Sequence, residues 1–177
     1  MGSYMRANRA MIALLAKGET LDSNGSLPDD WERFLAKGMS VVDDCLVIGE
    51  LMPHLRRERE RMDRTGFECF VNHVHLKEIE KPETVLRQAI AFCTRAAQEA
   101  HRIAPDRSIR FIISRNCQDW TVHLHTSRCD EPSWVSDDLE GYLEEEVLVL
   151  DSPELLTHCF VIGVKSRLRS LTLPEGF

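Results

Sequence analysis

The segment PETVLRQAIAFCTRAAQEAHRIA, residues 82–104, constrains the fold of this chain more than any other. Proline stands at its first turn and again directly after it, which is the pattern of a helix bounded by prolines. Val85, Ala89 and Phe92 recur at helical spacing and form an apolar stripe. We therefore predict one long helix here, with an apolar side that is buried within the domain.

Strand-like segments lie on both sides of this helix in the sequence. Residues 67–76, 108–114, 119–127 and 146–151 are rich in apolar residues that alternate with polar ones or form short runs, as strands do. The fold class that we predict is therefore α+β. N-terminal helices are followed by a largely antiparallel sheet of about four or five strands, packed on the 82–104 helix.

The residues RNCQD, between the second and the third of these segments, indicate a hairpin turn. With Gln118 and Asp119 at the tip, Ile113 would face Leu124 across the strand pair. That register buries the apolar residues of both strands on one face of the sheet. The two histidines of the third segment are then expected together on the opposite face.

The N-terminal part of the chain is expected to be helical. A Gly-, Ser-, Asp- and Pro-rich stretch, GETLDSNGSLPDD, separates an initial helical pattern from apolar residues that recur near helical spacing from Trp31 onward. We expect an N-terminal helix and flexible loop in residues 1–30, followed by a single α+β domain in residues 31–177. Within that domain we expect helices in 31–64 and the sheet-containing part in 67–177.

The charge of the chain is unevenly distributed. No Lys or Arg occurs between Arg128 and Lys165, whereas this interval contains ten acidic residues. They are Asp130, Glu131, Asp137, Asp138, Glu140, Glu144, Glu145, Glu146, Asp151 and Glu154. Without these ten, 19 of the 29 acidic residues remain against 22 basic ones, a net charge of +3 compared with −7 for the whole chain.

Such an asymmetry favours a protein that meets a basic partner through its acidic segment, residues 130–154. We therefore predict a small acidic cytoplasmic interaction protein, such as an adaptor, an inhibitor or an immunity-like binder. A solvated face that only keeps the protein soluble is the alternative interpretation. The residues expected to contact the basic protein partner are Asp137, Asp138, Glu140, Glu144, Glu145 and Glu146.

Other features of the sequence restrict the class of partner. No apolar run approaches the roughly 18–20 residues of a membrane span, so no membrane partner is expected. A broadly basic surface is also missing, which argues against nucleic acid. The six cysteines include no C-x-x-C pair, and this spacing predicts reduced and mostly buried thiols.

The pattern His-x-His occurs twice, as His73 and His75 and again as His123 and His125. Two histidines at positions i and i+2 of a strand point to the same side, so their rings can converge on one ion. Should the two strands be neighbours with matched parity, the four histidines could bind zinc or another divalent transition metal.

This cluster supports an alternative function, a metal-dependent hydrolase in which metal-bound water is the nucleophile and a carboxylate is the general base. The competing interpretation is that the histidines are ordinary surface or buried side chains. The two differ in one spatial requirement: the two His-x-His segments must be adjacent strands with their histidines on one face. No complete catalytic motif is present in the sequence, so the sequence predicts neither a defined enzymatic activity nor its absence.

Overall fold

The structure is a computed structural model that describes residues 5–17, 26–50, 53–78 and 80–156. Its main sheet is antiparallel and has five strands in the order β1-β7-β5-β6-β4. These are β1 (Met5–Ala7), β7 (Glu146–Asp151), β5 (Ile109–Asn116), β6 (Asp119–Thr126) and β4 (His73–Lys77). The other elements are α1 (Arg9–Leu15), α2 (Asp29–Leu35), the hairpin β2 (Met39–Val42) and β3 (Cys45–Ile48), α3 (Pro53–Arg59), α4 (Arg64–Val71), α5 (Pro82–Ile103), a 3₁₀ turn η1 (Leu139–Gly141) and α6 (Ser152–Leu155).

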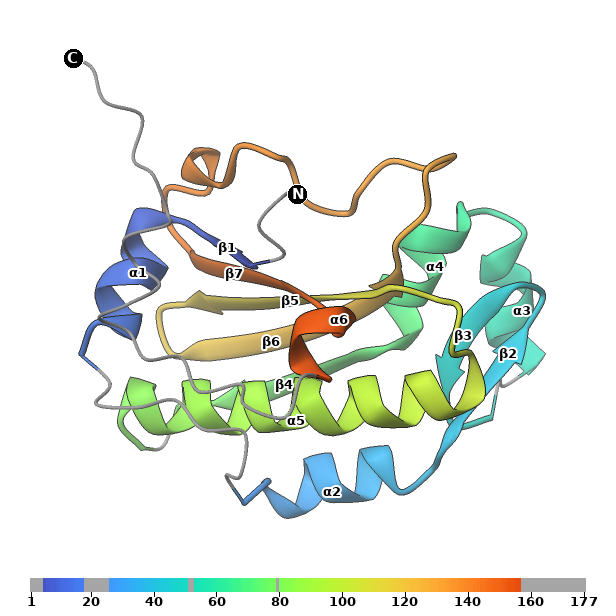
Figure 1. Ribbon diagram of the computed structural model, residues 1–177, viewed down its shortest axis with the longest axis horizontal. Coiled ribbons are helices and arrows are strands. Elements are labelled where there is room, and N and C mark those ends of the chain that lie inside the picture. The colour runs from blue at the N-terminus through green and yellow to red at the C-terminus, as the bar shows by residue number, and fades with distance from the viewer. Residues whose placement is uncertain (1–4, 18–25, 51–52, 79, 157–177) are drawn as a thin grey trace.

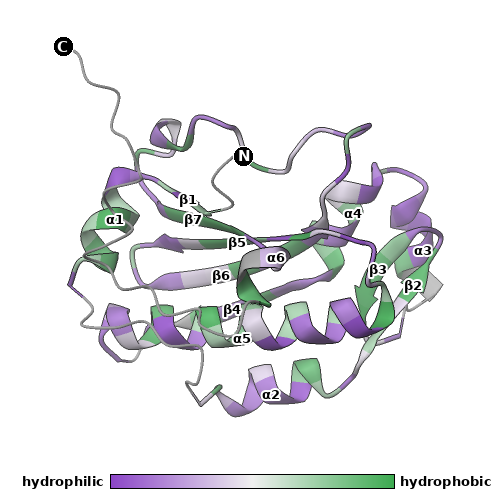
Figure 2. Ribbon diagram, viewed as in Figure 1, coloured by the Kyte–Doolittle hydropathy of each residue, from purple (hydrophilic) through white to green (hydrophobic). Residues whose placement is uncertain are grey.

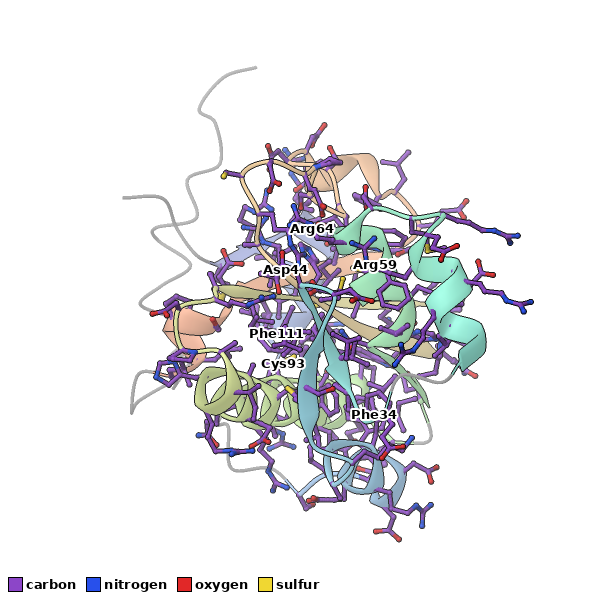
Figure 3. The ribbon with its side chains drawn as sticks, turned by 90° about the vertical axis from the view of Figure 1, so that its right-hand side faces the viewer. Phe34, Asp44, Arg59, Arg64, Cys93 and Phe111 are labelled. Carbon is purple, nitrogen blue, oxygen red and sulfur yellow. The ribbon has the colours of Figure 1, made fainter. Side chains whose placement is uncertain are left out.

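The long helix α5 packs on one face of this sheet, and α2 lies on the far side of α5 (Figure 1). Phe111 of β5 and Cys93 of α5 point into the layer between the sheet and α5 (Figure 3), and both are fully buried. Trp31 of α2 meets Phe92 of α5 edge to face, with ring centroids 5.2 Å apart. The predicted α+β class, with an antiparallel sheet on one long helix, is confirmed.

Hydropathy follows this arrangement. In Figure 2, hydrophobic residues are concentrated in β7 and in the β2–β3 hairpin, whereas α5 alternates between hydrophobic and hydrophilic bands, as an amphipathic helix does. Among the described residues, no helix has the length and apolar character that crossing a membrane would require.

Residues 39–48 lie within the segment 31–64 predicted to be helical, and that prediction is wrong for them. They form the β2–β3 hairpin, in which Val42 is paired with Cys45 around a two-residue Asp43-Asp44 turn. Both aspartates have positive φ, 49° and 62°, which is the backbone of the tight turns that connect hairpin strands. Gly38, with φ of 72°, separates α2 from the hairpin.

The strand predicted for residues 67–76 begins only at His73. Residues 64–71 are the helix α4, which starts where the Asp63 side chain accepts a hydrogen bond from the amide of Gly66, 2.6 Å away. The helix conformation is favoured because it places Glu68 and Asn72 one turn apart, on the side that faces β3. Propensity alone does not show this tertiary requirement.

The β5–β6 hairpin exists, but its register differs from the prediction. Ile113 is opposite Val122 rather than Leu124, and the two-residue tip is Cys117 and Gln118, with φ of 55° at Cys117. The shift is two residues along the partner strand. Because side chains alternate with a period of two, the predicted faces are unchanged by it.

The N-terminal residues share the sheet and core of the rest of the protein. Strand β1 pairs with β7, and Met11, Leu14 and Leu15 of α1 are buried in the main core. Most of the loop expected to follow them, and the segment after residue 156, lie outside the described residues.

Three of the cysteines, Cys45, Cys69 and Cys93, are buried, and burial raises the pKa of each thiol. Cys117 and Cys129 are exposed. The five described cysteines are free thiols in the structure, and Cys159 lies outside the described residues.

A buried ion pair between Glu68 of α4 and Arg128, just after β6, connects three parts of the fold. Glu68 is fully buried, and its two carboxylate oxygens accept hydrogen bonds from the Arg128 guanidinium at 2.8 and 2.9 Å. They also accept the backbone amides of Leu46 in β3 and Thr126 in β6, and the hydroxyl of Thr126. Buried charge is tolerated only with this degree of satisfaction.

Asn72, directly after α4, completes the connection to β3. Its side-chain amide donates to the carbonyl of Leu46 at 2.7 Å and accepts the amide of Ile48 at 2.8 Å. Side chains therefore bind the outer edge of β3, where a neighbouring strand would otherwise be needed.

Replacing Glu68 with Ala should reduce the free energy of unfolding by about 3–5 kcal/mol, because Arg128 would stay buried without its carboxylate. Urea denaturation of the purified variant measures this loss. The matched control is Glu99→Ala, which breaks the exposed pair of Glu99 and Arg102 on α5 and should cost less than about 1 kcal/mol. Equal losses in the two variants would contradict the assigned role of Glu68.

Candidate functional site

The face of the sheet opposite α5 contains most of the residues singled out in the sequence. Its β5–β7 half is covered by a small apolar cluster in which Ile112, Val147 and Val149 meet Val135 and Leu139 of the segment after β6. The other half, formed by β4 and β6, displays the histidines.

Three of the four histidines lie on one face of two adjacent strands, as a shared site would require. Strands β4 and β6 are adjacent and antiparallel, with His73 opposite His123 and His75 opposite Thr121. The rings of His73 and His123 are stacked with centroids 5.5 Å apart, and the ring of His75 stands edge-on to His73 at 5.0 Å. The doubled motif therefore forms one continuous imidazole surface, which we call the histidine face (His73, His75 and His123).

Two of these rings are oriented by the last turn of α4. The Nδ1 atom of His73 donates to the carbonyl of Phe70 at 2.7 Å, and Nδ1 of His123 donates to the carbonyl of Cys69 at 3.0 Å. Helix ends leave such carbonyls without intrahelical partners. Because a carbonyl oxygen only accepts hydrogen bonds, both contacts require a proton on Nδ1, and Nε2 is the ring nitrogen left for another contact.

The electrostatic environment of His123 favours its neutral form. Burial lowers its pKa, the hydrogen bond to Cys69 opposes this, and the neighbouring His73 and His75 lower the pKa further. A neutral imidazole is the form that can accept a hydrogen bond or bind a metal ion through nitrogen.

His125 does not join this face as an accessible member. It is 2% exposed, its Nδ1 donates to the carbonyl of Thr126, and its Nε2 is buried without a hydrogen-bond partner in the described part of the chain. Burial lowers its pKa, against the hydrogen bond to Thr126 and the charge of Glu68. Within the described residues no group of three or more His, Cys, Asp or Glu is arranged to hold a metal ion, so the four histidines do not form the predicted cluster.

Two exposed aromatic residues border the histidine face. Trp134 is 49% exposed and its ring centroid is 6.3 Å from that of His123, while Phe70, whose carbonyl binds His73, is 42% exposed. Through its ring contact with His123, Trp134 extends the histidine face with an exposed aromatic surface. Neither residue belongs to a sequence motif that would have indicated its position beside the histidines.

Most of the acids expected to bind a partner have contacts within the protein. Asp137 pairs with Arg6 at 2.8 Å, and Glu146 pairs with Arg115 at 2.9 Å. The side chain of Asp138 caps η1, and that of Glu140 accepts the amide of Arg9. These four carboxylates hold the segment in place.

Asn8 is the anchor of this segment. It is buried, and its side chain donates to the carbonyl of Glu145 at 2.7 Å and of Tyr142 at 3.4 Å, while accepting the amides of Met11 and Val147. One side chain thus joins the start of α1, strand β7 and the loop before β7.

The remaining two acids have a different environment. The side chains of Glu144 and Glu145 have no hydrogen bond or ion pair within the described residues, and Leu143 beside them is 90% exposed. Leu143 therefore presents an apolar side chain to solvent, and the carboxylates of Glu144 and Glu145 lie beside it in the sequence. We call Leu143, Glu144 and Glu145 the acidic tip.

The first two acids of the interval, Asp130 and Glu131, pair with Arg64 at the start of α4. Arg64 also pairs with Asp44, which lies at the turn of the β2–β3 hairpin close to Arg64 (Figure 3). Burial acts to raise the pKa of Glu131, but hydrogen bonds from Arg64 and Thr65 outweigh it and lower the pKa to about 2. This network is structural, because each charge in it has an opposite charge in contact.

Together the fold and these surfaces define an α+β protein that has an antiparallel five-stranded sheet, with a partly exposed histidine face and an anchored acidic loop. The chain belongs to the Uncharacterized protein PM0498 family, whose model matches residues 6–167. No curated protein and no solved structure matches the chain.

The depressed pKa of Glu131 predicts a specific pH dependence of stability. Its folded-state pKa of about 2 lies below the ordinary 4.5, so its stabilising contribution is complete above pH 4.5 and is lost as the pH falls toward 2. Urea unfolding of wild type and Glu131→Gln between pH 7 and about pH 2 measures it. The stability difference between the two proteins should shrink over that window, and a difference that stays constant would contradict the assignment.

Proposed function

We propose that the protein is a small cytoplasmic interaction protein, an adaptor, inhibitor or immunity-like binder, that meets a basic protein partner through its acidic segment. The observation that supports this most directly is the acidic tip, in which Leu143 is 90% exposed beside the unpaired Glu144 and Glu145. Burying one leucine side chain contributes roughly 1.5–3 kcal/mol, so a partner with an apolar pocket bordered by Lys or Arg would gain from both chemistries.

The anchoring of the segment also supports a binding role. The Asn8 hydrogen bonds, the Asp137–Arg6 pair and the cap formed by Asp138 hold the loop before any partner arrives. A loop that is already ordered loses less conformational entropy when it binds. The acids first regarded as partner contacts therefore divide into four that position the loop and two that are available for contact.

The acidic tip can be tested by affinity capture from cell extract with the purified protein as bait. Wild type should retain a specific partner whose yield falls as salt is raised, and the triple variant Leu143→Ala, Glu144→Lys, Glu145→Lys should lose it. The matched control is Asp106→Lys with Asp119→Lys, which reverses two exposed carboxylates elsewhere. A yield of captured partner that changes neither with salt nor in the triple variant would refute the proposal.

A second candidate function is the metal-dependent hydrolase. The observation in its favour is that β4 and β6 are neighbours and place three histidines on one face. In this proposal the metal, zinc or another divalent transition metal, would supply a bound water as nucleophile at neutral pH. The histidines would hold the metal, and a carboxylate would be needed as the general base.

Hydrolysis of phosphoester and peptide substrates in the presence of added zinc tests this candidate. Activity that needs the metal and is lost in His123→Asn, with His101→Asn as the control histidine on α5, is the expected result. No turnover by a folded, zinc-supplemented protein would remove the hydrolase from consideration.

A further inference from the structure

We infer that His73 and His123 form a two-nitrogen binding site for a divalent transition metal ion, with Zn²⁺ as the ion to test first. The site differs from the four-histidine cluster expected from the sequence, because it uses one histidine from each strand. It shares residues with the hydrolase candidate but requires no catalysis. Metal binding without hydrolysis would therefore overturn the hydrolase alone.

The first argument is the position of the pair in the sheet. The amide of Leu124 donates to the carbonyl of Asn72, so 72 and 124 form a hydrogen-bonded position and His73 faces His123 at the next, non-hydrogen-bonded one. At such positions the Cα atoms are about 4.5 Å apart and the side chains are closest. The stacked rings, 5.5 Å apart and inclined by 29°, agree with this geometry.

The second argument is the state of the ring nitrogens. Metal-binding histidines usually donate their other ring N–H to a carboxylate or a backbone carbonyl, which fixes the tautomer and the ring orientation. Here Phe70 and Cys69 supply those carbonyls, so Nε2 of both rings has a lone pair free for an ion. Within the described residues the hydrogen bonds of both rings are made by Nδ1 and not by Nε2.

The third argument is the charge at this place. Both carbonyls belong to the C-terminal turn of α4, where the aligned peptide dipoles produce a partial negative charge that favours cations. Imidazole nitrogen is a preferred ligand of zinc, copper and nickel, whereas calcium and magnesium prefer oxygen. The inferred ligand class is therefore a borderline transition-metal ion whose remaining positions are filled by water.

His75 is not included as a ligand. Its ring is perpendicular to that of His73, and its Nδ1 lies 3.4 Å from the hydroxyl of Thr121 rather than against a carbonyl. His125 is excluded by its burial. A specific site would lose metal binding when His73 or His123 is replaced but not when His75 is replaced. A general affinity of exposed histidines for metal would not show this difference.

Isothermal titration of the full-length, untagged protein with zinc chloride tests the inference. Wild type should bind one equivalent at micromolar concentrations, and His73→Asn and His123→Asn should each weaken binding by more than the roughly 10–100-fold cost of losing an outer-shell partner. His75→Asn and His101→Asn should retain the one equivalent. Undetectable binding, or binding unchanged in both ligand variants, would overturn the site.

A measurement without metal provides an independent check. Long-range ¹H–¹⁵N spectra of the metal-free protein should show His73 and His123 in the Nδ1–H tautomer, as their carbonyl contacts require. Nε2–H tautomers at both positions would overturn the inference. Far-UV circular dichroism verifies that each variant is folded. If His123→Asn is unfolded, the result for His73→Asn, whose position is on the edge strand β4, decides the test.

Discussion

The carboxylate of Glu68 is the contact on which the arrangement of the two sheets depends. It belongs to α4 and lies where this helix meets the β2–β3 hairpin and the end of β6, and it accepts hydrogen bonds from Leu46 of β3, from Thr126 of β6 and from Arg128 just after β6. Taking a charge out of water costs several kcal/mol unless its lone pairs are satisfied. Five donors to one carboxylate fulfil that condition here, so the three elements can hold one another only in this relative position.

Helix α4 also connects the histidine face to the first two residues of the acidic segment. Its first residue, Arg64, holds Asp130 and Glu131 at the start of the acidic interval, and its last turn orients His73 and His123 through backbone carbonyls. A displacement of this eight-residue helix would therefore affect both the histidine face and the ion pairs of Arg64. The acidic tip is held separately, through the hydrogen bonds of Asn8 to the carbonyls of Tyr142 and Glu145.

Local patterns in the sequence were sufficient for the overall class of fold. The apolar stripe of residues 82–104 and the run at 146–151 identify α5 and β7, and the antiparallel sheet follows from the alternation around His123. Even a register error of two residues left the buried faces intact, because strand side chains repeat every two positions.

The errors have physical causes that a single local pattern does not contain. The Asp43-Asp44 turn between two β-branched and apolar runs was a hairpin signal, but it was obscured by apolar spacing that also fits a helix. Glu68 belongs to a helix because of contacts with residues about 20 and 60 positions away. The pairing of Asp137 with Arg6, across 131 positions, is likewise invisible in the composition that suggested a free acidic face.

The pairing of β1 with β7 has a consequence for how the chain reaches this structure. Met5 is opposite Leu150, and Asn8 bonds Val147 across 139 positions, so the first strand completes the sheet only with the last one. During synthesis on the ribosome, residues 5–8 must wait for nearly the whole described chain to emerge before they can be placed. The loop before β7, which Asn8 holds, therefore takes its final shape after translation of the sheet is complete, and contacts this distant in sequence make such a step slow relative to formation of α5.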